Sequence, residues 1–111
     1  MIPADLLSAL REKDPELFNT WIAVVRQIDN HAADGTDIDT PISMAWLQYC
    51  LQEAIRARGW RYGIDYDTDR VCATVLKNID SAWKLIGVGY GSTEAEALMR
   101  AYLSALSGER I

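Results

Sequence analysis

Two of the three strand-like segments in this chain are apolar on both faces, and this pattern restricts the folds open to it. Residues 60–66 alternate between apolar and polar side chains, whereas residues 70–77 and 82–90 have apolar residues at consecutive positions. The polar stretches between them, residues 67–69 and 78–81, are typical of turns, so the strands form an antiparallel meander. An antiparallel sheet with one face in water alternates throughout. We therefore expect both faces of this sheet to be covered.

Four helices are expected around the strands. A short helix covers residues 4–11, and an Asp-Pro-Glu sequence opens a second, amphipathic helix over residues 15–28. A Thr-Pro pair opens a third helix over residues 42–58, which Gly59 ends. Its apolar arc is wide, so this helix is largely buried. The fourth helix covers residues 92–106.

These elements predict an α+β fold, a three-layer α/β/α sandwich built on an α-β-β-β-α unit with N-terminal helices. The helices 42–58 and 92–106 cover one face of the sheet, and the helix 15–28 covers the other. If the helix 15–28 does not do so, the second face is a partner or dimer surface. The whole chain is one domain, with an N-terminal helical segment at 1–30, a polar loop at 31–40 and the α-β-β-β-α core at 41–111.

Composition excludes several classes of function. The 111 residues carry a formal net charge of −5, whereas a protein that binds nucleic acid by neutralising phosphates needs a basic face. No stretch approaches the roughly 20 apolar residues of a membrane helix, and no signal peptide is evident. Cys50 and Cys72 fit a reducing compartment, either as free thiols or as a pair. We expect a cytoplasmic protein that contacts neither membranes nor nucleic acid directly.

The glycine-rich stretch GVGYGSTEAE (87–96) precedes a helix, as phosphate-binding loops do, and can be compared with them. It lacks the lysine of a Walker-type loop and the spacing of the dinucleotide fingerprint. Glu94 and Glu96 occupy the first helical turn, where they complement the helix dipole and repel anions. Thr93 and Glu96 form a capping box. We interpret the glycines as the end of a strand and a turn before a capped helix.

Catalytic and metal-binding patterns are missing. His31 is the only histidine, so no Ser-His-Asp or Cys-His arrangement can be assigned, and no Cys/His spacing suits zinc. Residues 65–69 (DYDTD) begin like a calcium loop, but the glycine and glutamate that complete it are replaced by Arg70 and Leu76. We expect no cofactor, no metal and no enzymatic activity.

One basic cluster is a candidate ligand or partner site. Arg56, Arg58 and Arg61 surround Trp60 and Tyr62, so a nucleotide or an acidic partner could be held by bidentate and stacking contacts. The alternative is that these are solvated residues at the end of a helix, where cations are favoured in any case.

The part of the chain from residue 40 onward resembles two known families. Its α-β-β-β-α order and closing stretch resemble the double-stranded-RNA-binding domain in fold, but Thr93–Glu96 stand where that family has RNA-binding lysines. TPISMAWLQYCLQEAIRARGW (40–60) and STEAEALMRAYLSAL (92–106) are similar to the phage ABA-sandwich domain family. This second resemblance covers residues 40–107. It implies a three-layer sandwich and a small phage-encoded protein.

We therefore expect a phage or prophage accessory protein that acts by binding, most plausibly an anti-defence factor that blocks a bacterial immune protein. Its partner is a host protein or complex with a basic surface, because the chain is acidic. One alternative is a sponge that sequesters a small nucleotide signal, and another is an interaction module of different purpose. If Trp60, Tyr62, Tyr66 and Trp83 are exposed, a homodimer is expected.

Overall fold

The computed structural model describes residues 3–28 and 41–108, which form four helices and three strands. These elements are α1 (Ala4–Lys13), α2 (Pro15–Ile28), α3 (Pro41–Ala57), β1 (Arg61–Tyr66), β2 (Val71–Ile79), β3 (Ala82–Gly91) and α4 (Glu94–Gly108). The α+β class, the α-β-β-β-α unit and the N-terminal helices are confirmed. The predicted loop at 31–40 and His31 lie outside the described residues.

The helix ends follow the sequence signals. Asp14 caps α2, because its Oδ1 accepts a hydrogen bond from the Leu17 amide at 3.1 Å. Thr93 Oγ1 accepts one from the Glu96 amide at 3.2 Å, which is half of the predicted capping box. The other half is absent because the Glu96 carboxylate accepts from the Ser92 hydroxyl instead. Gly59 ends α3 in a left-handed conformation with φ of 76°.

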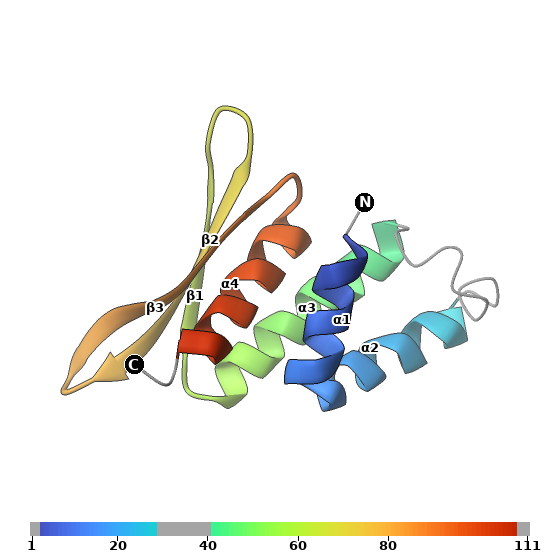
Figure 1. The fold of residues 1–111 in the computed structure, drawn as a ribbon, viewed down its shortest axis with the longest axis horizontal. Coiled ribbons are helices and arrows are strands. Elements are labelled where there is room, and N and C mark those ends of the chain that lie inside the picture. The colour runs from blue at the N-terminus through green and yellow to red at the C-terminus, as the bar shows by residue number, and fades with distance from the viewer. Residues whose placement is uncertain (1–2, 29–40, 109–111) are drawn as a thin grey trace.

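The sheet is an antiparallel meander in the order β1-β2-β3. Its register places Ile64 of β1, Ala73 of β2 and Gly89 of β3 side by side on the face that the helices cover. The β2–β3 turn is tighter than predicted, because only Asp80 and Ser81 separate the strands, both with positive φ. Since β1 begins opposite Leu76, the rest of this hairpin is a two-stranded ribbon. It projects beyond the helices (Figure 1).

The order of the layers differs from the expected α/β/α arrangement. In Figure 1 all four helices lie on one side of the sheet, with α4 and α3 next to it and α1 and α2 outside them. The helix 15–28 was predicted to cover the second face, but α2 packs against α3 instead. Trp21 of α2 is fully buried there, and its Nε1 donates to the Ser43 carbonyl oxygen at 2.9 Å. The wide apolar arc of α3 therefore serves two contacts, one with α4 and one with α2. The second face of the sheet carries no described helix.

The glycines of β3 allow α4 to touch the sheet at backbone distance. Gly87, Gly89 and Gly91 face α4, and a Cβ atom added to Gly89 would lie 2.4 Å from both the Ala101 amide nitrogen and the Ala97 carbonyl oxygen. No real Cβ contact is that short, so only glycine fits. The strand ends at Gly91, one residue beyond the predicted bound, and Ser92 and Thr93 connect it to α4, as the predicted strand end and turn before a capped helix require. We call this contact the glycine seam.

The glycine seam predicts that Gly89→Ala destabilises the protein by about 3 kcal/mol or more, because the new methyl group collides with helix backbone rather than with a movable side chain. Urea unfolding followed by circular dichroism measures this loss. Gly108→Ala is the matched control, since a Cβ there meets its nearest atom, the Ile86 carbonyl oxygen, at 3.5 Å. If the two variants are equally stable, the close backbone contact between Gly89 and α4 is contradicted.

Candidate functional site

The predicted cluster of Arg56, Arg58, Trp60, Arg61 and Tyr62 is divided among three places in the structure. Arg56 and Tyr62 form the first, on the helix side of the sheet at its β1 edge. Arg56 Nη2 donates to the Tyr62 hydroxyl oxygen at 3.2 Å, and Nη1 lies 3.5 Å from Glu53 Oε2. Both charged side chains are about half exposed, so this pair is a solvated surface contact.

Arg58 and Trp60 form the second place, around the buried ring of Tyr102. The Arg58 guanidinium lies 5.2 Å from the Trp60 ring centroid, and its Nε donates to the Tyr102 hydroxyl at 3.3 Å. Trp60 is only 5% exposed and belongs to the core, so it offers no stacking surface to a ligand.

Tyr102 connects the N-terminal helices to the rest of the fold. Its hydroxyl donates to Asp14 Oδ2 at 2.5 Å, and the other oxygen of Asp14 caps α2. This hydroxyl opens onto a cleft of about 460 Å3 between α2 and α3 that also contains Cys50, Glu53 and Arg58. Burial, followed by the hydrogen bond to Asp14, raises the pKa of Tyr102 from 10.0 to about 12. The sequence signalled Asp14 as a cap but gave no sign of its partner 88 residues away.

Arg61 forms the third place, on the opposite face of the sheet. Its guanidinium lies 4.2 Å from the ring centroid of Trp83. A second pair repeats this arrangement, with Arg70 3.9 Å from the ring centroid of Tyr90. The structure thus separates Arg61 from the other four predicted residues and joins it to side chains that sequence reasoning did not assign to a site.

We define the open face as the side of the sheet turned away from α4. Its large side chains are exposed, with Leu85 56% exposed, Tyr90 43% and Trp83 37%. The register places these residues on the face opposite Val75, Ala73 and the glycine seam. The members of the open face are Arg61, Gly63, Asp65, Cys72, Thr74, Leu76, Asn78, Trp83, Leu85, Val88 and Tyr90, with Arg70 at its end. The sequence signal for this surface was the apolar character of both strand faces, which we had assigned to a covering helix.

The composition of the open face suits macromolecular recognition. Tryptophan, tyrosine and arginine are the residue types that dominate binding hot spots. Each arginine is braced on an aromatic ring, so it loses less side-chain entropy on binding than a free surface arginine. Within residues 3–28 and 41–108, no grouping of His, Cys, Asp and Glu could hold a metal ion. Cys50 and Cys72 are free thiols, and burial raises the pKa of Cys50.

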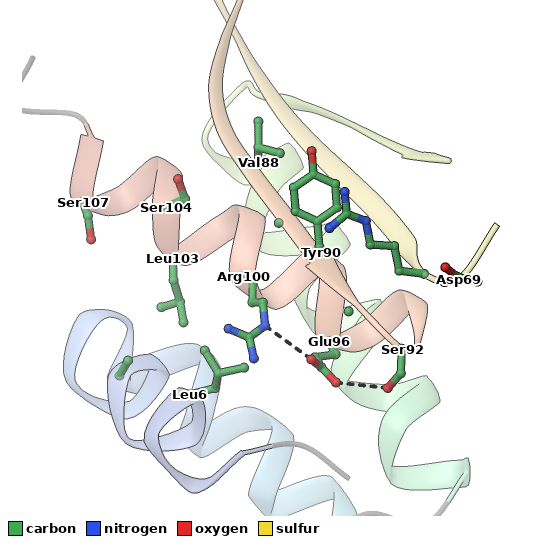
Figure 2. Close-up of a pocket in the computed structure, with 14 residues that line it drawn as sticks. Leu6, Asp69, Val88, Tyr90, Ser92, Glu96, Arg100, Leu103, Ser104 and Ser107 are labelled. Atoms are coloured by element: carbon green, nitrogen blue, oxygen red, sulfur yellow. Dashed lines mark hydrogen bonds and ion pairs between the residues drawn. The ribbon is translucent and has the colours of Figure 1, made fainter. Parts of the chain in front are cut away.

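A shallow groove of about 690 Å3 runs between α1, α4 and β3 (Figure 2). Glu96 lies between two partners there, because it accepts from the Ser92 hydroxyl and from Arg100 Nε, each at 3.3 Å. The Glu96 and Arg100 charges therefore compensate each other along the groove wall. Leu6 and Leu103 form its apolar side.

Comparisons with known proteins give no relative for this chain. No family model matches it, and neither does any curated protein or solved structure. In the part of the chain that the structure describes, no helix is long and apolar enough to cross a membrane.

The raised pKa of Tyr102 predicts how stability depends on alkaline pH. The hydroxyl stabilises the fold fully below pH 10.0, the unfolded value. This contribution is lost as pH rises through about 12, because the unfolded chain releases the proton in this range while the folded state still holds it. Below pH 10.0, Tyr102→Phe should cost about 1–3 kcal/mol, since it leaves Asp14 Oδ2 without its donor.

Urea unfolding of wild type and Tyr102→Phe across this pH range measures the effect. The difference between the two proteins should narrow as pH rises, whereas an exposed-site control, Tyr49→Phe, should remain close to wild type below pH 10.0. If the difference in unfolding free energy between wild type and Tyr102→Phe stays constant across this pH range, the hydroxyl does not titrate as described.

Proposed function

We propose that this protein acts by binding another protein through the open face of its sheet, and not by catalysis. The observation that carries this proposal is the exposure of Trp83, Leu85 and Tyr90 on a sheet face that no described helix covers. Monomeric globular proteins rarely expose a large contiguous apolar patch unless it has a partner. The conditional expectation from sequence, that an uncovered face is a partner or dimer surface, supports the same conclusion.

The charge around the open face supports a partner with a basic patch. Asp65, Asp67 and Asp69 gather where β1 turns into β2, and all three are exposed. With the net charge of −5, this acidic end would steer a basic partner toward the aromatic centre of the face. The affinity should then fall as salt concentration rises, because such rim charges are screened.

The phage resemblance supports a specific form of this proposal, in which the partner is a bacterial immune protein and the chain is an anti-defence factor. The nucleotide-sponge alternative has less support, because Arg56, Arg58 and Arg61 point to three different places. We therefore base the function on the open face and treat the sponge as the outcome to be excluded by calorimetry with nucleotides.

The proposal predicts that Trp83→Ala combined with Leu85→Ser abolishes partner binding while leaving the fold intact, because both side chains are exposed. Loss of one hot-spot aromatic costs about 2 kcal/mol or more, roughly a 30-fold loss of affinity. Affinity capture from bacterial lysate at low and moderate salt, followed by mass spectrometry, identifies the partner. Titration with the purified partner then gives the change in affinity.

Tyr49→Ala is the matched control, since Tyr49 is an aromatic residue 51% exposed on α3, away from the sheet. Partners retained by wild type and Tyr49→Ala but lost by the double variant would support the open face as the binding surface. A partner that binds the double variant with unchanged affinity would refute it. For the anti-defence form, wild type but not the double variant should restore phage plating on a host that carries the targeted immune system.

A further inference from the structure

β1 is a free edge of the sheet. Within residues 3–28 and 41–108 it pairs only with β2, in the strand order β1-β2-β3, and α3 covers its helix side (Figure 1). The other edge, β3, is longer, but it carries Lys84 and has the three glycines of the glycine seam. Lysine discourages strand addition, and glycines offer no cross-strand side-chain contacts. β1 has neither lysine nor proline, so it is the edge better suited to pairing.

The sequence of β1, RYGIDY, is self-complementary about Gly63. If a second copy lies antiparallel with Gly63 opposite Gly63, Arg61 comes opposite Asp65 of the second copy, and the symmetry repeats the pair. On the other face Tyr62 comes opposite Ile64 of the second copy, again twice. Opposite charges and aromatic–β-branched pairs are the cross-strand pairs that stabilise antiparallel sheets.

No neighbouring register gives the same complementarity. Centring the pair on Tyr62 places Arg61 opposite Gly63, and centring it on Ile64 places Asp65 opposite Gly63, so the ion pairs are lost within the strand in both cases. A slip of one residue places side chains of the open face against those of the helix face. The charges of β1 therefore specify a single register.

We propose that β1 pairs with β1 of a second copy of this chain, centred on Gly63, so that two three-stranded sheets join into one continuous sheet. The interface is isologous, because each copy contributes the same residues. Both Arg61 and Asp65 are exposed in one copy, so their ion pairs form without burying an unpaired charge. In the dimer Arg61 gives up its contact with Trp83 and donates a charge-assisted hydrogen bond to Asp65 of the second copy.

Joining the edges has two consequences for exposed residues. Tyr66, which is 70% exposed in one copy, comes opposite Trp60 of the second copy at the end of the strand. The open faces of the two copies become one surface with the helices of both copies on the other side. This pairing places its ion pairs at the β1 edge of the open face, whereas Trp83, Leu85 and Tyr90 form no cross-strand pair in it. Different variants therefore test the pairing and the proposed binding function.

Sedimentation velocity of the full chain, from about 1 μM to about 1 mM, tests the pairing over the affinity range of weak and transient interfaces. Wild type should dimerise. Arg61→Asp should weaken dimerisation by about 10- to 30-fold, because it places like charges opposite each other twice. The double variant Arg61→Asp with Asp65→Arg should restore the dimer, since it exchanges the two charges and recreates both pairs in this register.

The restored dimer is the decisive outcome, because a merely structural effect of losing Arg61 would persist in the double variant. Tyr90→Ala, on the opposite edge strand, is the control and should dimerise like wild type. Thermal melting by circular dichroism confirms that every variant folds. A wild type that stays monomeric throughout the range, or a charge exchange that fails to restore the dimer, would overturn the proposal.

Discussion

The close contact between β3 and α4 is the constraint on which the rest of this structure depends. Three glycines on the strand and three alanines on the helix, Ala97, Ala101 and Ala105, bring two backbones together without intervening side chains. Because α4 lies so near the sheet, its other side is free to bury Leu98 and Tyr102 among the remaining helices. The helices then stack outward from α4, and nothing in this stacking requires a helix on the second face of the sheet.

Most of the secondary structure could be predicted from the sequence, because capping residues and hydrophobic period act locally. The Asp14 and Thr93 caps, the Gly59 stop and the alternation in β1 all lie where the sequence placed them. The layer order could not be predicted in the same way. A strand that is apolar on both faces looks the same whether its second face meets a helix or a partner, so Leu85 and Tyr90 gave no means of choosing.

The candidate site was predictable only in part, for a related reason. Residues 56–62 are close in sequence, yet the end of α3 and the start of β1 turn alternate side chains toward different faces, so Arg58 joins a buried tyrosine while Arg61 joins the open face. The two cation–π pairs of the open face join residues far apart in the sequence, Arg61 with Trp83 and Arg70 with Tyr90. Only the register of the sheet brings such pairs together, and register is a property of the whole fold.

The two-stranded ribbon that carries Trp83 also has a consequence for local stability. Beyond Leu76 it is two strands wide, and its turn holds Asp80 and Ser81 at φ of 54° and 66°. Aspartate tolerates this left-handed conformation, whereas serine does so less well. Such a segment opens locally at a lower free energy than the whole protein. A ligand that recognises Trp83 in the closed ribbon can bind only the molecules whose ribbon is closed. Its apparent affinity is therefore lowered in proportion to the fraction that is open. In the proposed binding mode, the conformation of this turn therefore affects affinity without touching the ligand.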